Sequence, residues 1–146
     1  MGCIALIAAA SFAQNVGNNL DYTRQSLKAQ KRVIIGGSVA MSEREAGAFW
    51  PIHDAYERER DRIDDREAKL IEEYLAAGAQ LSDARARAML DETIGLRDER
   101  LALKKRYVKR FGAVLSPKQV MQYFQIDSKL DALLAADLAR AIPIVR

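Results

Sequence analysis

The residues best suited to acid–base chemistry are His53, the single histidine of the chain, with Asp54 beside it and Tyr56 close by. Neighbouring residues on a helix point in different directions, so a catalytic triad would need a nucleophile converging on His53 from elsewhere. No serine framed by glycines is present, and the single cysteine, Cys3, lies in a segment that we expect to be removed. We therefore predict no catalytic residues and no enzymatic activity, and interpret His53 as part of an aromatic cluster with Trp50 and Tyr56.

Metal and cofactor sites are the next candidates. Three aspartates, at positions 61, 64 and 65, lie close enough in the sequence to be considered as ligands of a hard cation, but arginines at 58, 62 and 66 alternate with them. Calcium usually takes its oxygen ligands from a loop that wraps around it. One cysteine and one histidine provide no soft ligand set, and Gly36-Gly37 lacks the lysine of a phosphate-binding loop. We predict no metal and no cofactor, with the aspartates on a solvated charged face.

A dense group of basic residues lies between Arg97 and Arg110. On an amphipathic helix, such residues beside apolar atoms could hold partly unfolded chains by weak charge attraction. The predicted client-binding residues are Arg97, Arg100, Leu101, Lys104, Lys105, Tyr107 and Phe111. The alternative is a merely solvated face. Separately, the opposite charges of residues 61–73 and 104–110 could orient the pairing of antiparallel helices or of two protomers. The net charge of +3 is spread over an intermixed sequence, so we expect no nucleic-acid partner.

The amino terminus resembles an export signal. Cys3–Ala10 is an unbroken run of small and apolar residues, and Ser11-Phe12-Ala13 has small side chains where signal peptidase requires them. We predict a signal peptide over residues 1–13, cleavage after Ala13 and a periplasmic location, although Met1-Gly2 supplies no basic side chain. The run is too short to span a bilayer, and we expect no membrane segment after cleavage. The alternative is an apolar first helix of the mature fold.

The elements that must position these residues are helical. A chain of 146 residues suits one domain, and its composition favours long helices. After a flexible lead-in and a weak first helix over residues 14–40, the helical domain covers residues 41–146. Capping signals at Ser42, Ser82 and Ser116-Pro117 predict helices over about 43–77, 83–111 and 117–141. We predict an all-α fold in which a long helical hairpin and flanking helices form a bundle.

Apolar spacing predicts which face of each helix is buried. In the first long helix the stripe includes Phe49, Tyr56, Ile63 and Leu70, and Pro51 inside it predicts a bend rather than a break. In the second, apolar residues recur every seven positions, which suits packing against an antiparallel neighbour. That predicted core stripe is Ile94, Leu101 and Val108, with Leu90 and Phe111 on the same side. The last helix has its stripe at Val120, Phe124, Leu130, Leu134 and Leu138.

One helix start carries a resemblance to a known family. Leu115-Ser116-Pro117-Lys118-Gln119 is similar to the L-T/S-x-x-Q (LTXXQ) motif of the Spy/CpxP family of bacterial periplasmic proteins. The run that begins Phe49-Trp50-Pro51 resembles a signature of related exported proteins. The motif residues are Leu115, Ser116, Gln119, Phe49, Trp50 and Pro51. The resemblance implies a helical chaperone or envelope-stress sensor without ATP, forming a cradle-shaped dimer.

Two functional hypotheses follow. The first is an exported helical protein that binds unfolded or envelope proteins, of the chaperone or stress-sensor type. The second is a structural protein that pairs with one dedicated envelope partner.

Overall fold

Four long α-helices make up the chain. The computed structural model describes residues 3–144, with side chains at position 18 and from position 22 onward. The helices are α1 (Cys3–Ser38), α2 (Glu43–Ala77), α3 (Asp83–Gly112) and α4 (Pro117–Ala141), with a short 3-10 turn at Gly78–Gln80. No strand occurs in the described residues. The predicted all-α fold is confirmed. Each of the last three helices begins at its predicted residue, and α3 ends at Gly112, one residue beyond its predicted end.

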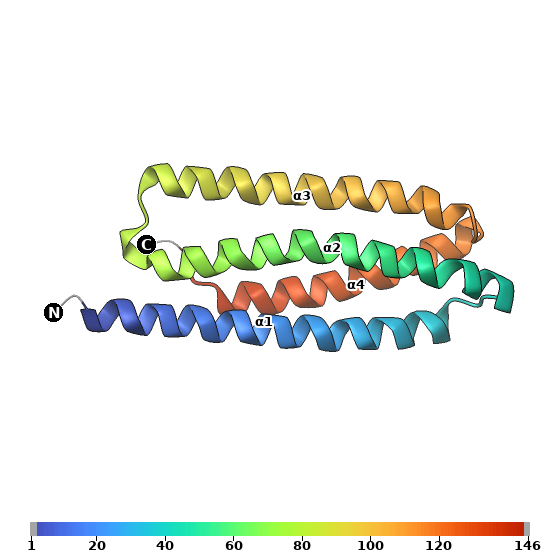
Figure 1. The fold of residues 1–146 in the computed structure, drawn as a ribbon, viewed down its shortest axis with the longest axis horizontal. Coiled ribbons are helices and arrows are strands. Elements are labelled where there is room, and N and C mark those ends of the chain that lie inside the picture. The colour runs from blue at the N-terminus through green and yellow to red at the C-terminus, as the bar shows by residue number, and fades with distance from the viewer. Residues whose placement is uncertain (1–2, 145–146) are drawn as a thin grey trace.

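The helices alternate in direction along the long axis of the molecule (Figure 1). The α1–α2 and α3–α4 connections, residues 39–42 and 113–116, lie at one end, which we call the capped end. The α2–α3 connection, residues 78–82, lies at the other, which we call the open end. Helix α2 packs extensively against α1 and α3, and α1 packs against α4, but α3 and α4 make only limited contact. The bundle is therefore incompletely closed between α3 and α4.

Serine caps fix three of the helix starts. Oγ of Ser42, Ser82 and Ser116 accepts a hydrogen bond from the backbone N–H three residues later, at 3.2–3.3 Å. At Ser42 and Ser116 the side chain of the third residue, Glu45 or Gln119, accepts in return from the cap's own N–H, completing a capping box. Both boxes lie at the capped end, where they define how the chain enters α2 and α4.

Aromatic side chains from three helices fill the core beside the capped end. Phe49 and Tyr56 of α2, Phe111 of α3 and Tyr123 of α4 are each 1% exposed or less. The rings of Phe111 and Tyr123 lie 4.6 Å apart between centroids, and those of Phe49 and Phe111 lie 5.1 Å apart, within the range of favourable ring pairs. The bundle is therefore held most firmly at this end.

The structure differs from expectation in α1. Residues 14–21, expected as a flexible lead-in, are helical, and α1 continues through Gly36 and Gly37 to Ser38. The helix also includes residues 3–13 of the predicted leader, whereas Met1 and Gly2 lie outside the described residues. Packing of the C-terminal part of α1 against α2 and α4 outweighs the weak helix propensity of its glycines. Pro51 lies within one continuous helix, as predicted.

The predicted core stripe of α3 is wrong except for Phe111. Leu90, Ile94, Leu101 and Val108 are 43–60% exposed. The buried face instead presents Met89, Leu96, Leu103, Tyr107 and Phe111 to α2 and α4. The physical reason is that two seven-residue patterns coexist in this helix, and Met89, Leu96 and Leu103 form the second. Both satisfy the same periodicity, so spacing alone does not select the buried one.

Candidate binding groove along α3

An apolar stripe covers the outer side of α3. It consists of Leu90, Ile94, Leu101 and Val108, which we call the α3 stripe. At 100° per residue these four positions lie within about 40° of one another around the helix axis. From the first to the last, 18 positions at 1.5 Å each make the stripe roughly 27 Å long. An exposed apolar row of this length on one helix is a candidate contact surface for another polypeptide, with Arg97 beside it between Ile94 and Leu101.

A groove opens beside the α3 stripe, toward the open end. Its volume is about 340 Å³, and α2, α3 and α4 all contribute to its lining. Leu70 and Tyr74 come from α2, Met89 and Leu90 from α3, and Leu138 from α4. We call this the open groove. It exists because α3 and α4 are not packed together along their length, and because Leu90 belongs to both features, the open groove and the α3 stripe form one surface.

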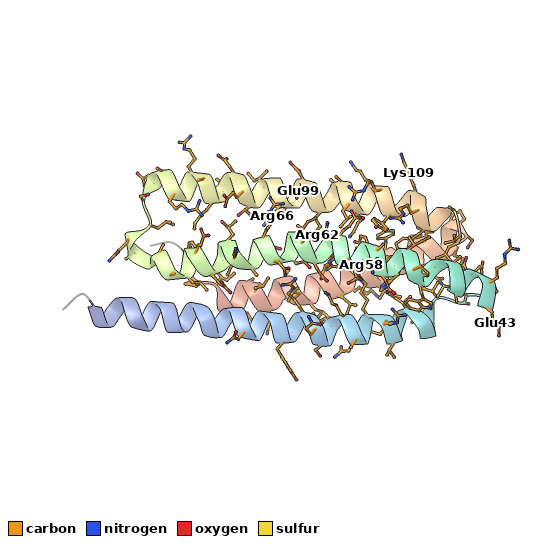
Figure 2. All side chains as sticks on the ribbon, viewed as in Figure 1. Glu43, Arg58, Arg62, Arg66, Glu99 and Lys109 are labelled. Carbon is orange, nitrogen blue, oxygen red and sulfur yellow. The ribbon has the colours of Figure 1, made fainter. Side chains whose placement is uncertain are left out.

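Three cations flank this surface. Arg97, Lys105 and Lys109 are exposed, and within the described residues no carboxylate lies within ion-pairing distance of any of them. Arg97 also lines the open groove. In Figure 2 the labelled Lys109 points away from the bundle. The apolar surface is therefore accompanied by positive charge that the fold itself does not neutralise.

The opposite side of α3 is different in character. There α2 and α3 enclose a second depression of about 320 Å³, lined mainly by charged side chains. Arg66 and Glu99 pair across it at 2.6 Å (Figure 2). Arg106 pairs with Glu59, whereas Arg62 is exposed and makes no ion pair with a described residue. Most of the charges on this side are therefore paired within the fold.

The seven predicted client-binding residues do not form a single surface. Arg97, Leu101 and Lys105 are exposed. Arg100 instead reaches Asp64 and Glu67 of α2, and Lys104 reaches Asp127 of α4 at 3.4 Å. Tyr107 and Phe111 are 0% exposed and belong to the aromatic core, so they are unavailable to a client in this structure. The predicted pairing of acidic α2 with basic α3 is present in part, through Arg100 and Arg106.

The motif residues also have structural roles. Leu115 is buried, Ser116 caps α4, and Nε2 of Gln119 donates a 2.7 Å hydrogen bond to the backbone oxygen of Ala40. That bond joins the first turn of α4 to the α1–α2 connection. The residues that carry the sequence resemblance therefore stabilise the capped end.

The other motif run lies nearby on α2. Phe49 is in the core, the guanidinium of Arg32 lies 4.3 Å from the ring centroid of Trp50, and Pro51 is exposed. A contact of this kind between a cation and a ring face is attractive. It joins the C-terminal part of α1 to α2.

A buried ionic cluster was not anticipated from the sequence. Asp127 of α4 is 0% exposed and accepts hydrogen bonds from Lys31 at 2.6 Å, Arg60 at 2.8 Å and Tyr56 at 3.2 Å. Lys104 of α3 is also within ion-pairing distance, so the cluster includes residues from all four helices. We call Asp127, Lys31, Arg60, Tyr56 and Lys104 the Asp127 network. A signal was present, because Asp127 lies seven residues after Val120 on the apolar face of α4.

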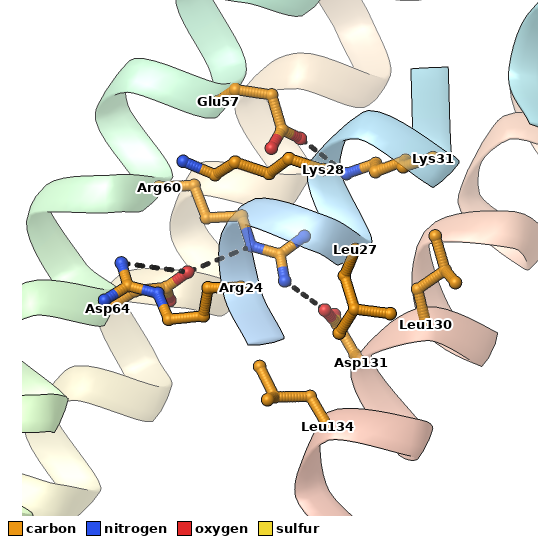
Figure 3. A pocket seen from close by; sticks show the side chains of 10 residues that line it. All are labelled: Arg24, Leu27, Lys28, Lys31, Glu57, Arg60, Asp64, Leu130, Asp131 and Leu134. Atoms are coloured by element: carbon orange, nitrogen blue, oxygen red, sulfur yellow. Dashed lines mark hydrogen bonds and ion pairs between the residues drawn. The ribbon is translucent and has the colours of Figure 1, made fainter. Parts of the chain in front are cut away.

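The space beside the Asp127 network is small. A cavity of about 30 Å³ is lined by Arg24, Lys31, Arg60, Asp64 and Asp131, among others (Figure 3). One water needs about 10–15 Å³ on this measure, so the cavity holds roughly two. It is too small for an organic ligand, and the ion pairs drawn in Figure 3 close it from several sides. We therefore interpret the Asp127 network as structural.

Burial shifts the ionisation of several of these groups. For Asp127, burial opposes the charged form, but Lys31 and Arg60 outweigh it and hold the pKa of the carboxyl below its usual value. The pKa of the Asp64 carboxyl is instead raised, because the effect of burial exceeds the opposing effect of the nearby Arg100 and Arg60 charges.

His53 is also buried, between the rings of Trp50 and Tyr123, and burial lowers its pKa. Its Nδ1 lies 3.3 Å from Asp54, and its Nε2 has no hydrogen-bond partner. The predicted contact of His53 with Trp50 is confirmed, but the second ring beside His53 is that of Tyr123 in place of the predicted Tyr56.

In the part of the chain that the structure describes, no helix is long and apolar enough to cross a membrane. The same residues contain no group of three or more histidine, cysteine or acidic side chains able to hold a metal ion. Comparison of the chain with protein-family models, curated proteins and solved structures found no match.

Proposed function

We propose that this protein is an exported helical binding module that holds segments of unfolded or envelope proteins on α3, as a chaperone or stress sensor without catalysis. The observation that carries the proposal is the α3 stripe, whose four residues are 43–60% exposed beside three cations that make no ion pair with the described residues. An apolar row exposed to water is unfavourable unless a partner covers it for part of the time. The apolar run at Cys3–Ala10 supports export.

Charge and apolar surface would act at different stages of binding. Arg97, Lys105 and Lys109 attract chains of opposite charge and raise the encounter rate, an effect that salt screens. The α3 stripe then supplies contact by removing apolar surface from water. The open groove adds a deeper contact for one bulky side chain.

The test is the aggregation of a chemically denatured client protein after dilution, followed by light scattering, with and without the purified chain. We expect suppression at a severalfold molar excess. The double variant Ile94→Glu/Leu101→Glu should lose most of it, because both positions are at least half exposed and contribute to contact rather than to the core. Val33→Glu is the matched control, because Val33 is a 76% exposed apolar residue of α1. Wild-type protein without effect on aggregation would refute the proposal.

The regular seven-residue spacing of Ile94, Leu101 and Val108 favours a second candidate, a dedicated helical partner in the envelope. Crosslinking in living cells separates the two. A dedicated partner gives one dominant adduct, whereas a general chaperone gives a broad distribution of masses. Export is checked separately by sequencing the mature amino terminus, which should begin at Gln14.

A further inference from the structure

We propose that the α3 stripe and the open groove together bind an acidic amphipathic α-helix from a partner protein, with a bulky side chain of that helix inserted into the groove. This inference rests on the proposed function and specifies the chemistry of what is bound. It makes α3 the recognition element and assigns a role to Arg97, which lies where the stripe and the groove meet.

The spacing of the α3 stripe indicates a helical occupant. Ile94, Leu101 and Val108 repeat every seven residues, with Leu90 four residues before the first. A second helix with the same seven-residue repeat can lie along such a row, with its apolar side chains against Ile94, Leu101 and Val108. The other seam position of α3 is apolar at Leu90 but basic at Arg97 and Lys104. An extended chain has its side chains on alternate sides, with a period of two residues, and does not match this pattern.

The charges beside the stripe indicate an acidic occupant. Lys105 lies about 40° from Leu101 around the helix axis, and Arg97 about 40° on its other side, so the two cations border the stripe on both edges. Neither has a carboxylate partner among the described residues. Carboxylates at the edges of a docked helix would pair with them, whereas a basic helix would be repelled.

The open groove accommodates a large side chain. Its volume of about 340 Å³ compares with about 150 Å³ for a cavity that takes up benzene. Leu70, Tyr74, Met89 and Leu138 supply apolar walls, and Leu90 connects the groove to the stripe. An aromatic residue near one end of the bound helix would bury its ring there. Such a buried aromatic anchor is the usual centre of binding energy in an interface.

A second copy of this chain is a less suitable occupant. If two α3 helices paired through the stripe, Arg97, Lys105 and Lys109 of both copies would face each other across one interface. The exposed acids of this region, Asp91 and Asp98, are fewer than these cations together with Arg87. Pairing of two copies would therefore bring together surfaces that both carry excess positive charge.

The experiment uses three synthetic helical peptides of four heptads and the purified full chain. The first has leucine at the heptad core positions, tryptophan in both terminal heptads and glutamate at the flanks. The second has lysine in place of glutamate, and the third has serine in place of the apolar core residues. Binding is measured by fluorescence anisotropy, and helix formation by circular dichroism.

We expect the acidic apolar peptide to bind about tenfold more tightly than the basic one, because three exposed ion pairs together amount to about one factor of ten. The serine peptide should not bind. Arg97→Gln/Lys105→Gln should remove most of the preference for glutamate, as should 0.5 M salt. Ala135→Trp, which fills the open groove, should weaken the acidic peptide severalfold, whereas Val33→Trp should not.

Equal binding of acidic and basic peptides would overturn the inference. Binding without an increase in the helix content of the peptide would also overturn it. A dimeric chain that Leu101→Glu converts to a monomer would assign the stripe to a second copy and also overturn it. If peptide binding lacks these preferences while aggregation of denatured protein is still suppressed, the inference fails and the proposed function stands. If neither peptide binding nor suppression is observed, the proposed function fails as well.

Discussion

The two ends of the bundle differ in how closely their helices are joined. At the capped end, two capping boxes, a hydrogen bond from the first turn of α4 to the α1–α2 connection and a cluster of buried aromatic rings hold the helices together. Toward the open end, apolar residues of α2, α3 and α4 line an open groove, and the α3 stripe runs from this groove along most of α3 to Val108. The Asp127 network lies between them and draws on all four helices. The difference indicates that side-chain bonds and ring contacts join the helices at the capped end, whereas a groove remains between them at the open end.

This division has a thermodynamic basis. Regions that recognise flexible partners are drawn from the less stable parts of a protein, because they must tolerate local opening. A bundle closed along its whole length would lose the groove. Separate substitutions at the two ends should therefore have separable effects on stability and binding.

The largest contrast is expected between Phe111→Ala and Leu90→Ala. Phe111 is 0% exposed and contacts rings of Phe49 and Tyr123, so its loss should cost about 3–5 kcal/mol of unfolding free energy. Leu90 is 60% exposed, and its replacement should change stability by less than about 0.5 kcal/mol. Urea denaturation followed by circular dichroism measures both. Similar losses at the two positions would break the comparison between the ends.

Asp127→Asn tests the middle of the bundle. It keeps the shape of the side chain but removes the charge that Lys31 and Arg60 contact in the core. Breaking a buried pair by removing one partner costs about 3–5 kcal/mol, and the remaining carboxylates, Glu57 and Asp131, should keep the loss near 3 kcal/mol. Asp137→Asn, at an exposed ion pair of α4, is the control and should change little. A neutral Asp127→Asn variant would contradict a structural role for the network.

Ser116→Ala should cost about 1 kcal/mol, because Oγ of Ser116 caps α4 at Gln119 N–H. Gln119→Ala should cost a comparable amount, since it removes both the return bond to Ser116 and the bond to Ala40. Ser82→Ala, at the open end, provides the comparison, because that cap lacks the reciprocal side-chain bond. Thermal melts measure all three, and the capped-end variants should lose at least as much as Ser82→Ala.

The smallest effect concerns pH. Because burial lowers the pKa of His53 in the folded state, the unfolded chain binds this proton more readily. The stability present above about pH 6.5, the ordinary pKa of histidine, is therefore lost as pH falls through the lowered value. His53→Gln should flatten the decline in melting temperature between pH 7 and pH 5. An unchanged slope in this variant would show that His53 is not the group responsible.

Much of the fold was predictable, because caps and helix breakers are local signals. Ser42, Ser82 and Ser116 each mark a true helix start, and Gly78 and Gly112 lie at the predicted ends. The extent of α1 was not predictable, because its helix forms through weak local propensity supplemented by contacts with α2 and α4.

The binding surface was predicted only in part. The basic region of α3 was recognised, but its cations divide between the surface and ion pairs inside the bundle, as Lys105 and Arg100 show. Two interleaved heptads on α3 made the buried face ambiguous, and only the placement of α2 decides between Leu101 and Leu103. The Asp127 network forms only when all four helices pack together. In the sequence, only the position of Asp127 on the apolar face of its helix indicated the network.

The central claim is that α3 is the surface on which other polypeptides bind. The most direct measurement introduces a photo-crosslinking amino acid at position 101 of α3 or at position 33 of α1, both exposed apolar sites, and compares the adducts formed in living cells. We predict adducts with other proteins from position 101 and few from position 33. Equal yields from the two positions, or adducts from position 33 alone, would contradict the assignment of binding to α3.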